Sequence, residues 1–90
     1  MDLNPKPDAL DTSAISCRQD FIIFLQQLRS DYLKNGEDWE NQNLGNFLEA
    51  LSAYAADIHG VYRNWSIAVD ADSASWRVFA DILRGATIYE

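Results

Sequence analysis

Apolar residues recur every three or four positions in three stretches of the chain, which is the pattern of amphipathic helices. The first stripe comprises Phe21, Phe24, Leu25, Leu28 and Tyr32. Ser16 and Gln19 precede it with the spacing of a capping box, in which each side chain bonds to the backbone amide of the other residue. Asn35 and Gly36 supply a stop, and we expect Gly36 to adopt the left-handed conformation that closes many helices.

The second stretch has the strongest helical periodicity of the chain. Its stripe comprises Leu44, Phe47, Leu48, Leu51, Ala55 and Ile58. Asn41 or Asn43 is placed to cap the start of this helix, because asparagine side chains accept hydrogen bonds from the first free amides. Gly60 is a natural end for it.

Residues 65–69 alternate apolar and polar or small side chains, which is typical of a strand. Because the chain has no second strand pattern to pair with it, we predict an extended connector that lies over the helices. A third helix is expected to begin at Asp72 or Ser73, and Gly85 should weaken it by about 1 kcal/mol relative to alanine. The stripe of this helix comprises Trp76, Phe79, Ala80, Leu83 and Ala86.

Three amphipathic helices with short connections predict an all-α, three-helix bundle around one core, with a short fourth helix as a variant. Residues 1–14 contain two prolines, three aspartates and little periodicity, so we predict a mobile N-terminal arm before a single helical domain at 15–90. Some apolar residues lie off the stripes and predict a partner surface or a homodimer interface. They are Ile22, Ile23, Val78, Ile82 and Ile88.

The balance of charge restricts the classes of partner. Fourteen acidic against seven basic residues give a net charge of −7, which repels nucleic-acid phosphates and anionic lipid surfaces. The longest uninterrupted apolar run, Phe21 to Leu25, is far shorter than a bilayer-spanning segment. The acidic, proline-containing start does not resemble a secretion signal. We therefore expect a cytoplasmic protein that binds a protein partner, with a basic partner favoured by the charge.

The only histidine lies in a short stretch rich in reactive side chains. Asp57 and His59 are two residues apart, so a helix would direct them about 200° from one another rather than toward a shared substrate. We expect His59 to contact the negative end of the helix dipole just before Gly60. Catalysis that uses Asp57, His59, Tyr62 and Arg63 in a small hydrolase, or a ligand site there, remains an alternative.

The sequence gives little support for a zinc site, a catalytic cysteine or a calcium site. Cys17 is the single cysteine, and one cysteine with one histidine cannot supply a zinc ligand set or an evident nucleophile and base pair. Glu37, Asp38 and Glu40 form an acidic loop without the regular ligand spacing of a calcium site, so cation binding there stays open. We predict no enzymatic activity and no cofactor.

The second half of the chain resembles a family of small bacterial proteins described as a domain of unknown function. The matching positions are Trp39, Asn41, Leu44, Phe47 to Leu51, Ala53, Asp57, Gly60, Tyr62, Asn64, Trp76, Ala80, Leu83, Ala86, Tyr89 and Glu90. The chain departs from that pattern at Tyr54, where the family tends to have tryptophan, and at His59, where it tends to have an acid. A proline that often precedes Trp76 is also missing. The resemblance implies a helical fold and carries no enzymatic activity.

Several polar and aromatic residues are candidates for partner contact or for a structural polar knot. Those tied to the family pattern, Asp57, Tyr62, Asn64 and Glu90, are expected to bond between the end of the second helix and the last one. Glu49 is expected to reach a loop amide or Arg77, or to contact a partner. The complete set is Trp39, Glu49, Asp57, Tyr62, Asn64, Trp76 and Glu90. Together they predict a non-catalytic protein–protein interaction module, with a structural homodimer as a further alternative.

Overall fold

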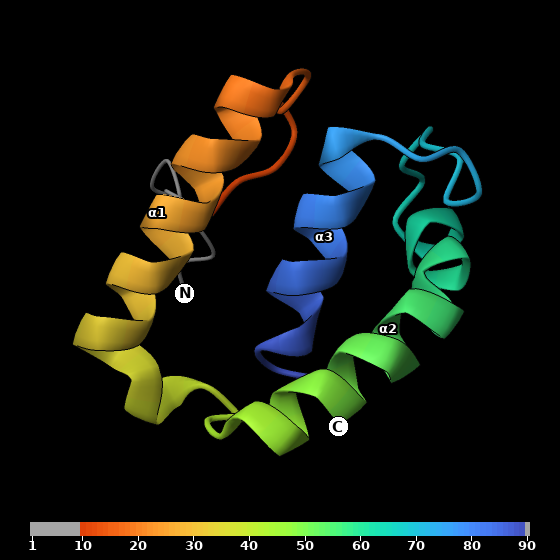
Figure 1. Cartoon of the computed structure of the whole chain (residues 1–90). Coiled ribbons are helices and arrows are strands. Elements are labelled where there is room, and N and C mark those ends of the chain that lie inside the picture. The colour runs from red at the N-terminus through yellow and green to blue at the C-terminus, as the bar shows by residue number, and fades with distance from the viewer. Residues whose placement is uncertain (1–9, 90) are drawn as a thin grey trace.

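The computed structural model describes residues 10–89 and consists of three α-helices and one short 3-10 helix (Figure 1). Their bounds are α1 Arg18–Asn35, η1 Gly36–Asp38, α2 Leu44–Asn64 and α3 Trp76–Ala86. Within these residues the structure contains no strand. The predicted all-α fold of three helices with a short fourth is confirmed.

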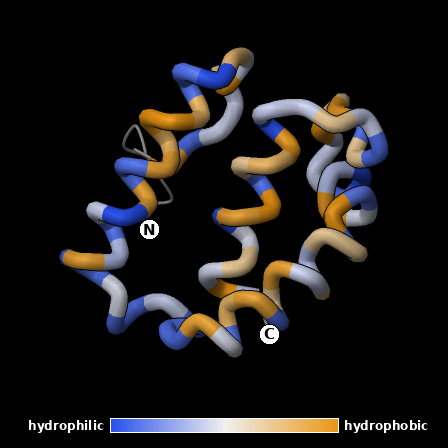
Figure 2. The backbone as a smooth tube through the Cα atoms, viewed as in Figure 1, coloured by the Kyte–Doolittle hydropathy of each residue, from blue (hydrophilic) through white to orange (hydrophobic). Residues whose placement is uncertain are grey.

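Helix α3 lies between the other two helices (Figure 1). It packs against α1 on one side and against α2 on the other, whereas α1 and α2 make no close backbone approach to each other within residues 10–89. Figure 2 shows hydrophobic positions recurring along α3 and along both flanking helices. A central helix needs two apolar faces, because each side is covered by a different neighbour.

The core therefore divides into two clusters. The cluster between α1 and α3 contains Phe24, Leu28 and Ala80, with Leu10, Ile15, Phe21, Trp39 and Leu83 packed against it. The cluster between α2 and α3 contains Ile58, Tyr62 and Val78, with Tyr54, Ile67, Val69, Ala71 and Ile82 around it. Val78 and Ile82, which we predicted to be surplus, belong to the second cluster. The other three surplus residues, Ile22, Ile23 and Ile88, are exposed as predicted.

The ends of α1 differ in detail from the sequence prediction. The amide of Ser16 donates to the Asp20 carboxylate at 3.1 Å, and this hydrogen bond lowers the pKa of Asp20. The predicted capping box of Ser16 and Gln19 is therefore wrong, because the carboxylate one position later is the stronger acceptor. The stop at Asn35 is confirmed, but Gly36 is right-handed with φ −59°, since the chain turns directly into η1.

Helix α2 begins where predicted, and Phe47, Leu51 and Ile58 of its predicted stripe are buried or half-buried, whereas Leu44, Leu48 and Ala55 are exposed. The Asn43 side chain accepts a hydrogen bond from the Asn46 amide at 2.8 Å, so one of the two expected caps is confirmed. Leu44 and Leu48, which the pattern placed in the core, are 71% and 52% exposed. The side chains that are buried or half-buried are Phe47, Ala50, Leu51, Tyr54, Ile58, Val61 and Tyr62. The rings of Tyr54 and Tyr62 thus pack toward the core, where we expected the side chains of Leu44 and Leu48.

Helix α2 ends after Asn64 rather than at Gly60, so that prediction is wrong. The amide of Ile67 donates to the Tyr62 carbonyl at 2.8 Å, which is the long-range bond of a Schellman motif. Ser66 has φ 56° and occupies the left-handed position that glycine usually takes. Helix α2 therefore continues through Gly60, and Ser66 supplies the left-handed residue at its end.

The connector from α2 to α3 contains no strand and lies over the second core cluster, as predicted. Helix α3 begins at Trp76, with the Ser75 side chain accepting a hydrogen bond from the Val78 amide at 3.1 Å. The predicted start at Asp72 or Ser73 is wrong because the Asp70 carboxylate accepts from both of these residues and forms a turn.

The N-terminal segment extends the packed domain beyond its predicted boundary. Residues 1–9 of the predicted arm lie outside the described residues. Leu10 and Ile15 pack against the first core cluster, and Thr12 is 7% exposed. Residues 10–14, which we assigned to the arm, thus cover part of α3. None of the helices between residues 10 and 89 has the length and apolar character needed to cross a membrane.

Candidate functional site

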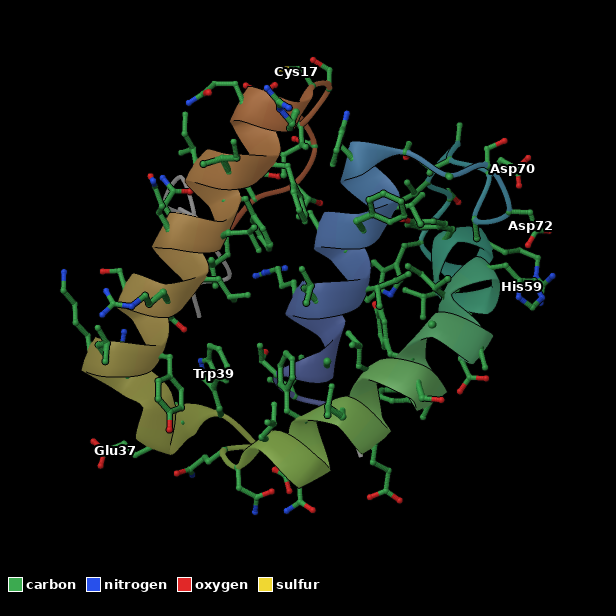
Figure 3. The ribbon with its side chains drawn as sticks, viewed as in Figure 1. Cys17, Glu37, Trp39, His59, Asp70 and Asp72 are labelled. Carbon is green, nitrogen blue, oxygen red and sulfur yellow. The ribbon has the colours of Figure 1, made fainter. Side chains whose placement is uncertain are left out.

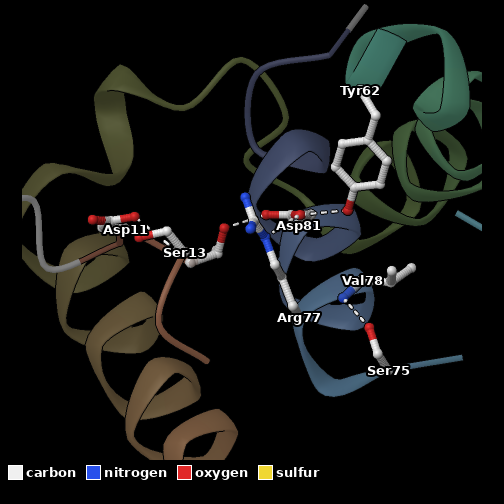
Figure 4. A network of polar contacts seen from close by, with 8 residues as sticks. Asp11, Ser13, Tyr62, Ser75, Arg77, Val78 and Asp81 are labelled. Atoms are coloured by element: carbon white, nitrogen blue, oxygen red, sulfur yellow. Dashed lines mark hydrogen bonds and ion pairs between the residues drawn. The ribbon is translucent and has the colours of Figure 1, made fainter. Parts of the chain in front are cut away.

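The carboxylate of Asp81, in the middle of α3, joins three parts of the chain. It accepts hydrogen bonds from the Thr12 hydroxyl of the N-terminal segment and from the Tyr62 hydroxyl of α2. Arg77, one turn earlier on α3, contributes an ion pair at 3.4 Å (Figure 4). Only 14% of the Asp81 side chain is exposed. The donors satisfy a charge that would otherwise be costly to bury.

Sequence reasoning did not single out Asp81. Two features of the sequence could have indicated it. Asp81 lies three residues after Val78, on the side of α3 that faces α2, and it lies four residues after Arg77. An acid on an otherwise apolar face, with a base one turn away, indicates a buried and partnered carboxylate. We had considered Arg77 only as a partner for Glu49.

Two tyrosines near Asp81 are held in their neutral form. Burial raises the pKa of the Tyr62 hydroxyl, and its hydrogen bond to the Asp81 carboxylate raises it further. Burial also raises the pKa of Tyr54, with a smaller contribution from the charge of Asp81. Both effects disfavour a phenolate, because a second negative charge would lie in a poorly hydrated site.

These shifts predict a loss of stability in alkali. Unfolded tyrosines lose their protons near pH 10, whereas folded Tyr62 keeps its proton to higher pH, so the folded state binds more protons there. The contribution of Tyr62 to the free energy of unfolding should be constant from about pH 7 to about pH 10 and fall above it. Tyr62→Phe should cost about 1 kcal/mol at neutral pH and reduce the alkaline slope. Urea midpoints measured from pH 7 to 11 test this, and equal slopes for both proteins would contradict it.

Two adjoining pockets lie at the end of the bundle where α1 ends, α2 begins and α3 ends. The larger, of about 490 Å³, is lined by the carboxylates of Asp31, Asp38 and Asp81 and by the rings of Trp39, Tyr54 and Tyr89. The smaller, of about 320 Å³, is lined by Glu40, Glu49, Asn41, Asn46 and Tyr89. We call this region, with both pockets, the acidic end. Among the described residues that line the two pockets, Arg84 is the one cation.

Trp39 forms a fixed wall of the larger pocket. Its indole Nε1 donates to the Asp31 carboxylate at 2.8 Å. The ring stacks on Phe47 with centroids 6.0 Å apart and meets Tyr32 edge to face at 5.1 Å. Trp39 is half-buried. Its contacts leave it little freedom to rotate.

The segment after α3 separates the two pockets. The hydroxyl of Tyr89 donates to the Asp57 carboxylate of α2, and its ring meets Tyr54 edge to face at 5.0 Å. The hydrogen bond to Asp57 raises the pKa of Tyr89. The Asn41 side chain donates to the carbonyls of Ala86 at 2.9 Å and Tyr89 at 2.6 Å. Asn41 thus anchors the end of α3 instead of capping α2.

The residues of the expected polar knot form two separate contacts. Tyr62 bonds to Asp81, and Asp57 bonds to Tyr89. Asn64 is exposed in the last turn of α2, and its side chain makes no hydrogen bond within the described residues. Glu90 lies outside those residues.

The other candidates lie at opposite ends of the molecule. Glu49 is exposed and lines the smaller pocket, while its expected partner Arg77 contacts Asp81. Trp76 is half-buried at the start of α3, with ring centroids 5.5 Å from Phe21 and 5.9 Å from Phe79. Trp39, Glu49 and Asp57 therefore gather around the acidic end, and Trp76 belongs to the packing of α1 on α3.

The groups of the alternative catalytic site do not converge. His59 projects from the outer side of α2, and Cys17 lies at the start of α1 (Figure 3). Asp57 and Tyr62 bond to different partners. His59 was expected at a helix end, but α2 continues for more than a turn beyond it, so the predicted contact with the dipole is wrong. In the described part of the chain, no three His, Cys, Asp or Glu side chains are arranged to hold a metal ion.

One long segment of the chain, part of which forms the acidic end, carries charges of a single sign. Between Lys34 and Arg63 the sequence contains no lysine or arginine, and this segment includes η1 and nearly all of α2. The acids within it are Glu37, Asp38, Glu40, Glu49 and Asp57, all exposed. A surface of this kind attracts cations and repels anionic polymers.

Comparison with known proteins identifies a family without a known activity. The family model described as "Family of unknown function (DUF7660)" matches residues 17–90. The predicted resemblance to a family of unknown function is confirmed, and the match includes α1 as well as the segment from Trp39 onward. Neither a curated protein nor a solved structure matches the chain.

Proposed function

We propose that this chain, which belongs to that family of unknown function, is a non-catalytic protein–protein interaction module that binds a basic partner. The observation that carries the proposal is the segment between Lys34 and Arg63, which contributes five exposed acids and no lysine or arginine to the acidic end and to the adjoining surface of α2. Complementary charge speeds the encounter of two proteins and selects against partners of the wrong sign.

Exposed apolar side chains from the same elements support the proposal. Leu33 near the end of α1, Leu44 and Leu48 at the start of α2, and Ile88 after α3 are all exposed. Ile88 also lines the larger pocket. Stable interfaces combine an apolar centre with a polar rim, so a partner could bury these side chains while its bases meet the carboxylates.

The test is co-purification of the chain from its native source in low salt, followed by mass spectrometry. We expect a stoichiometric partner with a basic surface, released at about 0.5 M salt, where screening shortens the range of charge interactions to a few ångströms. The paired variant Glu40→Gln and Glu49→Gln, on the smaller pocket, should weaken capture. The control variant, Asp70→Asn and Asp72→Asn, changes the net charge equally on the distant connector and should not.

The proposal fails if no stoichiometric partner is recovered in low salt. It also fails if the recovered protein is acidic, or if both paired variants reduce capture to the same extent. The last result would indicate attraction to net charge alone rather than to the acidic end.

A further inference from the structure

We infer that the larger pocket of the acidic end receives an arginine side chain of the partner, an inference that rests on the interaction proposed above. The pocket combines two features that suit a guanidinium group. Aromatic rings form its walls, and carboxylates are placed along its lining. Arginine is planar, stacks on aromatic faces and bonds to carboxylates through two donors at once.

The aromatic walls come from three separate elements and are held in place. Trp39 follows η1 and is fixed by its hydrogen bond to Asp31. Tyr54 lies on α2 and Tyr89 follows α3, and their rings meet edge to face at 5.0 Å. These rings are held in position before a planar cation enters the pocket, so little conformational freedom is lost on binding.

The carboxylates differ in what they can offer. Asp31 accepts one bond at each oxygen, from Trp39 at 2.8 Å and from Asn35 at 3.1 Å, so each oxygen keeps a second acceptor site. Asp38 is exposed, and its side chain makes no hydrogen bond within residues 10–89. Asp81 is already bonded to Thr12, Tyr62 and Arg77. We therefore assign the guanidinium contacts to Asp31 and Asp38.

The balance of charge in the pocket also favours a cation. Among the described residues the lining contains three carboxylates and one base, Arg84. Arg77 balances the charge of Asp81, and the carboxylates of Asp31 and Asp38 leave these described groups with a net negative charge. Its volume of about 490 Å³ lies within the range of about 300–1,000 Å³ that is typical of small-ligand sites.

The test uses the purified full chain and acetyl-arginine amide as a probe, with acetyl-citrulline amide as its uncharged analogue of similar shape. The readout is the indole N–H resonance of Trp39 in proton–nitrogen correlation spectra, with exposed Trp65 as an internal reference. We expect a saturable shift at Trp39 with a Kd on the order of 1 mM, no shift at Trp65, and at least tenfold weaker binding of citrulline.

A matched pair of variants locates the contact. Asp38→Asn should weaken the arginine probe about 3–5-fold, the effect of losing one partly exposed charge-assisted hydrogen bond. Glu37→Gln removes the same charge from the adjacent exposed residue, which does not line the larger pocket, and should change the Kd by less than about 1.5-fold. Both positions are exposed, so both variants should fold.

Several results would overturn the inference. These are no shift at Trp39, equal binding of citrulline, equal binding of acetyl-lysine amide, or equal effects of the two variants. The outcome is separate from that of the partner proposal because the probe needs no partner protein. If the probe binds but no partner protein is captured, the arginine pocket stands and the partner proposal is overturned. If a captured partner binds the Asp38→Asn variant as tightly as the parent chain, the partner proposal stands and the arginine pocket is overturned.

Discussion

Replacing Gly85 with alanine is expected to destabilise the protein by about 1–3 kcal/mol, although the same change stabilises most helices. The added Cβ would lie less than 3.0 Å from three carbon atoms of the Tyr54 ring. The ring must then leave its half-buried position between α2 and α3 and lose its contact with Tyr89. For a domain of this size the melting temperature should fall by roughly 5–20 °C in a thermal scan.

Gly60→Ala is the matched control. Gly60 also lies inside a helix, but an added Cβ there meets nothing closer than an Arg63 side-chain nitrogen at 3.9 Å. This variant should gain about 0.5–1 kcal/mol because alanine loses less conformational freedom on folding. The same substitution is thus expected to have opposite signs at two helical glycines.

A double variant tests the mechanism assigned to Gly85. In a Tyr54→Ala background the clash is absent, so Gly85→Ala should become neutral or stabilising. A Gly85→Ala protein as stable as the parent, or a cost that persists without the Tyr54 ring, would contradict the close contact of the two helices.

Gly85 illustrates which parts of the fold the sequence could predict. Helix periodicity is local, so the three helices and the end of α1 were predicted correctly. For Gly85 the sequence predicts that alanine would stabilise the helix, whereas the structure predicts the opposite, because an added Cβ would meet the Tyr54 ring of a different helix. The end of α2 was missed for a related reason. Ser66 takes the left-handed position while the following Ile67, which is half-buried, packs against the cluster that contains Tyr62 and donates to its carbonyl, whereas propensity alone favours Gly60.

The candidate site was predictable only in part. Trp39, Glu49 and Asp57 were singled out individually, and the structure places all three around the acidic end. Their grouping depends on how α2 crosses α3, which one helix at a time does not reveal. Asp81 was missed because the stripe on α3 was treated as a single apolar face. Once α3 is placed between two neighbours, an acid on its second face must have partners.

Replacing Asp81 with alanine is expected to cost about 2–4 kcal/mol, the second large effect. The Thr12 and Tyr62 hydroxyls both donate to this carboxylate, and both residues are almost fully buried. Without it each buried donor loses its partner, at a cost of about 1–3 kcal/mol per group. The free energy of unfolding from urea titrations at neutral pH measures the loss.

Asp57→Ala is the control for Asp81→Ala. Asp57 also accepts a hydrogen bond from a tyrosine hydroxyl, that of Tyr89, but it is exposed on the outside of α2. Water can replace the carboxylate there, so the cost should stay below about 1 kcal/mol. Equal costs for the two variants would show that burial of the Asp81 network contributes nothing to stability.

The Asp81 variant should also loosen one particular segment. Thr12 bonds the N-terminal segment to α3, and the Ile15 amide donates to the Thr12 carbonyl at 3.1 Å. Hydrogen exchange at Ile15 should therefore accelerate more than exchange at the Phe47 amide, whose hydrogen bond to Asn43 lies at the start of α2. Adding Tyr62→Phe removes one unpaired donor, so the double variant should lose less than the sum of the single losses. Simple additivity would mean that Tyr62 and Asp81 stabilise the fold independently of each other.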